Sequence, residues 1–147
     1  MSDESSLSPV SSDDVFRVVQ VVDVIFDFDV ATPVVVLREA EAGRRELRLP
    51  VALADATAIH HAWRHVAGLR PTSAELTTFI LQELRADVVA TRIVRYDAGV
   101  FFAELDVMTA QGRRVFDARP SDAITLALRQ SVPAPLLVAE GVLTAVN

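Results

Sequence analysis

The stretch from residue 115 to residue 130 constrains the fold most, because it predicts a strand that runs directly into a helix. Pro120 fits only the first turn of a helix, since it has no N–H to donate and its ring blocks an interior position. Ser121 and Asp122 follow it, and their side chains can accept hydrogen bonds from the free N–H groups of a first turn. The rest of the helix has almost no polar side, so we expect it to be buried on more than one face.

The start of this helix brings two carboxylates, a guanidinium and a hydroxyl close together, from Asp117, Arg119, Ser121 and Asp122. One interpretation is a capped helix start supported by an Arg–Asp pair. The other is a functional site, because helix N-termini at strand ends collect anions and metals. The residue types alone leave both interpretations open.

Length and composition indicate one soluble domain. A chain of 147 residues, 51% hydrophobic, is large enough to bury a core. No uncharged apolar run reaches the roughly 18 residues of a membrane span, so no membrane association is expected. The acidic start lacks the basic region of a signal peptide, and the absence of cysteine excludes disulfides, thiolate catalysis and Cys-based zinc sites. We therefore expect a cytoplasmic location.

The net charge of −6 argues against a protein that binds nucleic acid through charge alone. All fourteen basic residues are Arg, which favours bidentate phosphate contacts. The coding bias of a GC-rich genome explains the same composition, and we give it more weight. A basic strip with interleaved aromatic residues is absent from the sequence, so we do not expect a base-stacking platform of the RNA-binding type.

Periodicity along the chain predicts an α+β fold. Residues 1–14 are Ser-rich and acidic and predict a flexible tail, which leaves one domain at residues 15–147. Strands are expected from residue 15 and at 34–37, 46–49, 88–96, 100–108 and 113–117, with hairpin turns at 41–44 and 97–99. Helices are expected at 55–67 and from Thr72, where Thr72 and Glu75 match a capping box. The order predicts a single α+β domain with a mainly antiparallel sheet and three packed helices.

Three further expectations concern what these elements bury. In the first strand, one face is expected to consist of Phe16, Val18, Val22, Val24 and Phe26. In the helix after Thr72, the buried face is expected to consist of Leu76, Phe79, Ile80 and Leu84. The segment 136–138 is expected to add an edge strand, with only a short tail after it.

Three histidines fall in one predicted helix, at positions 60, 61 and 65. His61 and His65 are four residues apart, a spacing that lets two imidazoles bind one metal. No Glu follows His61, so the metalloprotease pattern is absent, and both histidines lie opposite the apolar stripe of the helix. A solvated helix face, or contact with a partner subunit, explains them without a metal.

Carboxylates are the other candidate metal ligands. Asp55, Glu75, Asp117 and Asp122 all lie at element boundaries, where side chains can converge. Nucleases that use Mg²⁺ or Mn²⁺ need two or three such groups to hold the ion against the scissile phosphate. Each carboxylate also has a structural role available as a cap or an Arg partner, so their convergence stays open.

The run from Asp117 to Ile124, followed by residues 126–129, closely resembles the signature of the bifunctional nuclease domain family. The similarity extends from about residue 16 to residue 143. It includes segments 34–39, 44–51, 55–59 and 97–105, and residues 70–71 with the helix after them. The differences fall on polar positions. Asp55 stands for a Glu, Ala74 for a His and Glu75 for an Asp.

The resemblance implies a metal-assisted nuclease that acts on RNA or DNA, with Mg²⁺ or Mn²⁺ as the expected cofactor. In that function four carboxylates position the ion or a water: Asp117, Asp122, Asp55 and Glu75. Which of them bind the metal directly is left open. The substrate-binding residues are Arg119 and Arg70, which contact phosphate, and Ser121. The alternative is a non-catalytic interaction or regulatory module that keeps the family fold, and the replacement of the His favours it.

Self-association, with a dimer favoured, is the last expectation. A helix that buries both Ile124 and Leu126, on nearly opposite sides, needs more than one covering layer. The first strand also carries Val19, Val21 and Ile25 on its more polar face, which a monomer would leave exposed. Closed two-fold assemblies are the commonest solution, although segment 136–138 can also supply the second layer.

Overall fold

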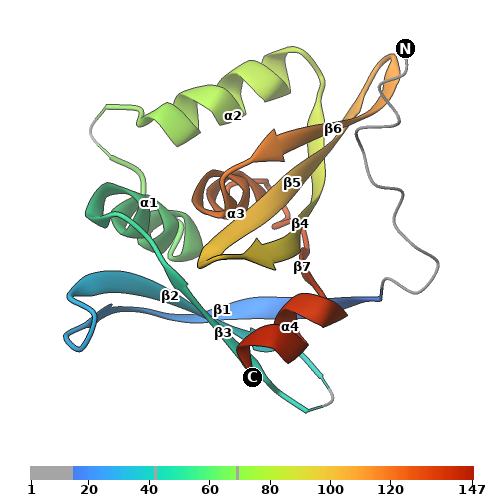
Figure 1. Cartoon of the computed structure of the whole chain (residues 1–147). Coiled ribbons are helices and arrows are strands. Elements are labelled where there is room, and N and C mark those ends of the chain that lie inside the picture. Colours follow the sequence, from blue (N-terminus) through green and yellow to red (C-terminus); the bar gives the residue numbers. More distant parts are fainter. Residues whose placement is uncertain (1–14, 42, 69) are drawn as a thin grey trace.

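The computed structural model describes residues 15–41, 43–68 and 70–147, so the predicted tail at 1–14 lies outside the described residues (Figure 1). Within the described part the chain forms seven strands and four helices. In order they are β1 (Phe16–Asp27), β2 (Thr32–Glu39), β3 (Glu46–Pro50), α1 (Leu53–Trp63), α2 (Ser73–Glu83), β4 (Asp87–Asp97), β5 (Val100–Thr109), β6 (Gly112–Ala118), α3 (Pro120–Leu128), β7 (Leu136–Ala139) and α4 (Glu140–Val146). The structure is a single α+β domain, as predicted. Helix α4 was not predicted.

All seven strands form one sheet, in the order β3-β2-β1-β7-β4-β5-β6. Every neighbouring pair is antiparallel except β4 and β7. The prediction that the segment around Leu137 adds an edge strand is therefore wrong. β7 lies between β1 and β4, where Leu136 and Val138 are buried. A short, wholly apolar run is typical of a strand that is covered on both faces. The residues next to this run do not indicate that the strand pairs with β1 on one side and β4 on the other, because those partners lie far away in the sequence.

The side-chain alternation of β1 differs from the prediction. Val19 and Val21 are buried, whereas Val18 and Phe26 are exposed. The pairing register with β2 shifts between Val21 and Asp23, and such a bulge exchanges the two faces of a strand. The expected exposed patch of Val19 and Val21 is therefore absent, and it supports no dimer.

The core collects fully buried side chains from α1, α3 and α4 as well as from the sheet, among them Ile59, Ile124 and Leu143. Helix α3 packs on β4 and β5 and contacts α1 on its other side. Ile124 is fully buried as predicted, but Leu126 is only partly buried. Among the described residues, none of the helices is long and apolar enough to cross a membrane.

Helix α2 corrects a further prediction, because its apolar stripe faces away from the core. Its buried residues are Glu75 and Thr78. The four side chains expected to be buried are instead 49–68% exposed. They are Leu76, Phe79, Ile80 and Leu84. The sequence period correctly indicates a helix here, but periodicity cannot tell which face of a helix meets its own chain.

Candidate functional site

Two carboxylates and one guanidinium converge where β6 passes into α3. Arg119 donates from Nε and Nη2 to the two oxygens of Asp122, at 2.9 and 3.0 Å. It also donates from Nη1 and Nη2 to Asp55, at 3.2 and 3.3 Å. Its Nη2 nitrogen thus contacts an oxygen of each carboxylate. We name Asp55, Arg119 and Asp122 the Arg119 cluster.

The strand-to-helix corner positions this cluster. Arg119 is the N-cap of α3, with extended backbone, and Pro120 opens the helix as predicted. The predicted capping by Ser121 and Asp122 is wrong, because no side chain caps this helix. Asp122 turns its carboxylate to Arg119 instead, and Ser121 is buried, with its carbonyl accepting a hydrogen bond from Thr125. Asp55 lies 64 residues earlier in the chain, in the first turn of α1.

The guanidinium of Arg119 is firmly charged and, at the same time, exposed to solvent. The hydrogen bonds from Arg119 to Asp122, reinforced by the charges of both carboxylates, raise the pKa of Arg119 further above its already high value. The Arg119 side chain is 63% exposed and that of Asp122 is 54% exposed, so water screens both ion pairs. Exposed ion pairs of this kind exchange partners at little cost. A guanidinium exposed in this way has the fork of donors that suits carboxylate and phosphate oxygens alike.

The Arg119 cluster lines a cleft of about 730 Å³ between α1, α2 and α3. The first turns of all three helices border this cleft. Asp55 lines the cleft from the first turn of α1. Thr72 and Ser73 line it from the start of α2, and Asp122 lines it from the first turn of α3. Helix N-termini attract anions because their first N–H groups have no partner within the helix. The cleft therefore combines the first turns of three helices with one exposed guanidinium, and each first turn carries an acidic residue: Asp55, Glu75 and Asp122.

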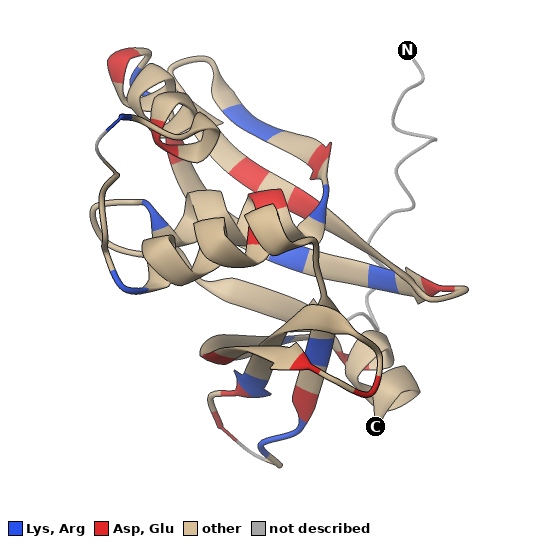
Figure 2. Ribbon diagram, turned by 90° about the vertical axis from the view of Figure 1, so that its left-hand side faces the viewer, with Lys and Arg blue, Asp and Glu red and all other residues tan. Residues whose placement is uncertain are grey.

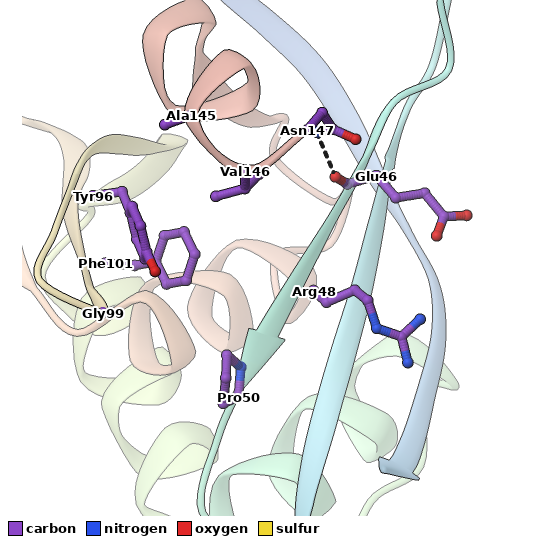
Figure 3. Close-up of a pocket in the computed structure, with 9 residues that line it drawn as sticks. All are labelled: Glu46, Arg48, Pro50, Tyr96, Gly99, Phe101, Ala145, Val146 and Asn147. Atoms are coloured by element: carbon purple, nitrogen blue, oxygen red, sulfur yellow. Dashed lines mark hydrogen bonds between the residues drawn. The ribbon is translucent and has the colours of Figure 1, made fainter. Parts of the chain in front are cut away.

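This cleft continues as a groove in two further parts. The middle part, about 350 Å³, shares Asp55 and Arg119 with the cleft and extends to Phe101. The outer part, about 490 Å³, shares Pro50 and Phe101 with the middle part and ends at Tyr96 and the C-terminus (Figure 3). Three adjoining pockets, each sharing lining residues with the next, therefore lie between the Arg119 cluster and an aromatic pair, and we call the middle and outer ones the groove.

Tyr96 and Phe101 form one wall of the outer groove, and β3 forms the opposite wall (Figure 3). The two rings lie 4.5 Å apart between centroids, and Tyr96 is 39% exposed. The charged ends of Glu46 and Arg48 point away from this space, so their main chain and side-chain stems line it. The groove therefore offers an aromatic surface next to an edge of β3 that pairs with no other strand in the described part of the chain. The hairpin register places Tyr96 opposite Phe101, so the alternation of β4 and β5 contained this signal, which the search for a basic strip missed.

The remaining predicted site residues lie outside the Arg119 cluster. Glu75 is buried, accepts the backbone N–H of Thr72, and lies 3.9 Å from Arg129. Asp117 is exposed on β6, where the register sets it opposite Glu104 rather than toward the cleft. Arg70 is exposed on the approach to α2 and takes no part in the ion pairs of the cluster. The structure thus brings together two of the four carboxylates and one of the two arginines.

Asp55 and Asp122 are the two carboxylates that the Arg119 cluster offers as ligands to a metal ion. Within the described residues, no group of three or more His, Asp or Glu side chains is placed to hold a metal ion. His61 lines the cleft, whereas His65 follows the end of α1 with a positive φ of 56°. The hypothesis that His61 and His65 bind one metal gains no support from this arrangement.

Comparison with known proteins places the chain in a family. The family model described as Bifunctional nuclease domain matches residues 35–147, which is most of the chain. The chain belongs to the bifunctional nuclease domain family. An uncharacterized protein of Mycobacterium tuberculosis is 34% identical over 117 residues, in strain CDC 1551 / Oshkosh and equally in strain ATCC 25618 / H37Rv. The match covers 76% of this chain and 64% of each relative, so the chain spans less than two thirds of their length.

The family match includes every residue of the Arg119 cluster and of the groove that leaves it. Strand β1 precedes the matched region. The family name associates the bifunctional nuclease domain with nuclease function.

Proposed function

We propose that this bifunctional nuclease domain cleaves phosphodiester bonds in single-stranded RNA or DNA. The observation that carries the proposal is the placement of Asp55, Arg119 and Asp122 in a cleft bordered by three helix N-termini. The cleft supplies a guanidinium that can bind phosphate and the first N–H groups of α1 and α3, which have no partner within their helices. It also supplies carboxylates next to the position that the phosphate would take.

Arg119 has two roles in this proposal. In the absence of substrate it neutralises Asp55 and Asp122. When a phosphate binds, the guanidinium turns to it and forms bidentate bonds of the kind it now makes to Asp122. The carboxylates then lose their partner and are free to accept hydrogen bonds from water or to bind a cation.

Asp55 and Asp122 fit a divalent ion as a two-carboxylate site. Mg²⁺ is commonly held by one or two carboxylates, several waters and the substrate phosphate, so a larger protein donor set is not required. Such an ion supplies Lewis-acid polarisation of the phosphate and a more acidic bound water. Because both carboxylates pair with Arg119 in the free protein, we expect the ion to bind together with the nucleic acid rather than before it.

The groove supports a single strand as the substrate. A duplex has its bases stacked inside, whereas a single strand can lay an unstacked base on an exposed aromatic ring. Tyr96 offers such a ring at the end of the groove that begins at Arg119. Because the net charge is −6, binding depends on these local contacts rather than on the overall field of the protein.

A non-catalytic interaction module is the second candidate function. It is favoured by the ion pairs that occupy both carboxylates and by Ala74, which lines the cleft with a methyl group only. In this case the cleft binds a phosphate-containing ligand through Arg119 without cleaving it. The same assay distinguishes the two candidates.

The test is cleavage of end-labelled single-stranded RNA and DNA by purified protein, with Mg²⁺, Mn²⁺ or EDTA. We expect metal-dependent cleavage, and Asp122→Asn and Asp55→Asn should each reduce the rate by roughly a hundredfold. Asp87→Asn is the matched control, because Asp87 is an exposed carboxylate at the start of β4 and lines neither the cleft nor the groove. It should cleave like the wild type.

Binding measured in parallel by fluorescence anisotropy completes the design. Tyr96→Ala should weaken binding of the single strand while leaving the folded protein intact. Equal cleavage by wild type and Asp122→Asn would contradict the proposed site. Binding that depends on Arg119, without cleavage under any metal condition, would replace the nuclease proposal by the interaction module.

A further inference from the structure

The surface around α2 and β6 exposes large apolar side chains that the candidate site does not use. Leu76, Phe79, Ile80 and Leu84 face outward from α2, and Phe116 is 52% exposed on the neighbouring strand β6. Figures 1 and 2 show α2 and β6 at the same end of the molecule in two perpendicular views. We name these five side chains the α2–β6 surface. A monomer that exposes so many large apolar side chains together is unusual.

Strand β6 adds an open hydrogen-bonding edge to this surface. Among the described residues it is the last strand of the sheet and pairs with β5 alone. The pair Thr109–Gly112 closes a two-residue turn, so these two residues exchange both of their backbone hydrogen bonds. Alternation along the ladder then directs the backbone groups of Arg113, Val115 and Asp117 toward the open edge.

The sequence of this edge is complementary to itself. When two copies of β6 pair antiparallel about a two-fold axis at Val115, Val115 faces its own counterpart. Arg113 of each copy then lies opposite Asp117 of the other, which places opposite charges across the strands. Within one copy Arg113 also binds Asp106, at 2.7 Å from both Nε and Nη2, so Asp117 of the partner would be a second acceptor for the same guanidinium. These are the same three residues whose backbone groups face outward, so charge and hydrogen bonding select one register.

We propose that a second copy of this chain covers the α2–β6 surface, with β6 paired to β6 and the two α2 helices in contact. The side chains of Phe116 and Arg114 lie on the α3 face of the sheet, opposite Leu105 and Val107. Because α2 packs on α3, the two-fold axis puts both α2 helices on that same face, and the proposal places their outward stripes against each other. The assembly is one continuous sheet of fourteen strands, twice the seven strands of one copy.

The exposed apolar area of the α2–β6 surface is of the size that an interface with a second copy requires. At their exposed fractions the five side chains present on the order of 600 Å² per copy, against about 800 Å² per partner in a stable interface. Val115 and the two strand edges supply much of the remainder. The proposal is independent of the nuclease function, although α2 also borders the cleft, so the dimer holds one wall of the cleft in place.

Light scattering of the full chain at micromolar concentration is the test. The expected mass is twice the 16.0 kDa of one chain. Ile80→Glu puts a charge in the centre of the outward stripe and should give a monomer. Val115→Pro should do the same, because it removes an N–H of the open edge while the bonds between β5 and β6 remain. Val132→Glu is the matched control, since Val132 is 82% exposed outside the α2–β6 surface, and it should stay dimeric.

Circular dichroism of each variant establishes that it is folded, and Asp117→Arg provides a third, surface-only change. That variant sets Arg against the Arg113 of the partner and should weaken the dimer. A wild-type mass of one chain would overturn the proposal. So would a dimer that survives both Ile80→Glu and Val115→Pro in folded form, because two copies would then meet elsewhere.

Discussion

Thr91 Oγ1 donates a 2.8 Å hydrogen bond to the backbone carbonyl of Ala123. Thr91 is 1% exposed in the middle of β4, and Ala123 lies in the first turn of α3. The bond therefore ties the start of the helix that carries Asp122 to the centre of the sheet. It links the stability of the core directly to the position of the Arg119 cluster.

The first prediction concerns this bond. Thr91→Val keeps the shape of the side chain but removes the donor, so the free energy of unfolding should fall by about 1 kcal/mol. Urea unfolding followed by circular dichroism measures the change. Thr57→Val removes a hydroxyl that bonds Leu53 within α1 at an exposed position, and its effect should stay below about 0.5 kcal/mol. Equal losses in both variants would show that Thr91 has no special role.

The second prediction compares two apolar residues of α3. Ile124→Ala removes a fully buried side chain and should cost about 2–5 kcal/mol of unfolding free energy. Leu126 is partly buried and lines the cleft, so Leu126→Ala should cost clearly less. The same urea titration measures both. A larger loss for Leu126→Ala would mean that the cleft is closed by a covering layer in solution.

Local chemistry made part of this structure predictable. Pro120 starts α3, Thr72 and Glu75 form the predicted capping box, and the turn at Ala98 and Gly99 has the positive φ values of a hairpin. Each of these features depends on neighbours within a few residues. The features that sequence reasoning placed wrongly depend on partners far away, namely the central position of β7, the bulge in β1 and the orientation of α2.

In the candidate site, too, the contacts between residues close in sequence were predictable and those between distant residues were not. Arg119 and Asp122 are three residues apart on one corner, so their pairing follows from local sequence. Asp55 reaches them only because α1 packs on α3, which no periodicity reveals. Asp117 is close in sequence, but strand alternation turns it to the other face of the sheet. The hairpin alternation contains the Tyr96–Phe101 pair, but the groove that this pair lines also depends on β3 and the C-terminal residues, which no local pattern connects to it.

The third prediction separates structure from catalysis at Glu75. Its hydrogen bond from the Thr72 backbone N–H lowers the pKa of Glu75, and Arg129 beside it acts in the same direction. The carboxylate therefore holds the start of α2 and partners a largely buried arginine. Glu75→Gln should lower the midpoint of thermal unfolding while cleavage below that temperature stays unchanged. A variant that is stable but inactive would return Glu75 to the catalytic residues.

The fourth prediction concerns pH and the ion pairs of α4. Arg45 donates to both oxygens of Glu140, at 2.7 and 2.9 Å, and Arg17 donates to it at 3.0 Å. The hydrogen bonds from Arg45, followed by that from Arg17, lower the pKa of Glu140 from 4.5 to about 2. Glu39 also binds Arg45, and these bonds lower the pKa of Glu39 as well.

The direction of the pH effect follows from these shifts. A carboxylate with a lowered pKa in the folded state adds stability above its unfolded pKa, and this contribution disappears as pH falls through the folded pKa. The wild type should therefore lose stability between pH 4.5 and pH 2, the interval between the two pKa values of Glu140. Urea unfolding is the suitable measurement, because an ionic denaturant would screen the pairs.

Glu140→Gln should be less stable than the wild type at neutral pH, and its stability should approach that of the wild type toward pH 2. Glu83→Gln, at an exposed position in α2, controls for the loss of one charge. A difference between wild type and Glu140→Gln that stays constant over this range would mean that the arginines stabilise the fold by packing rather than by charge.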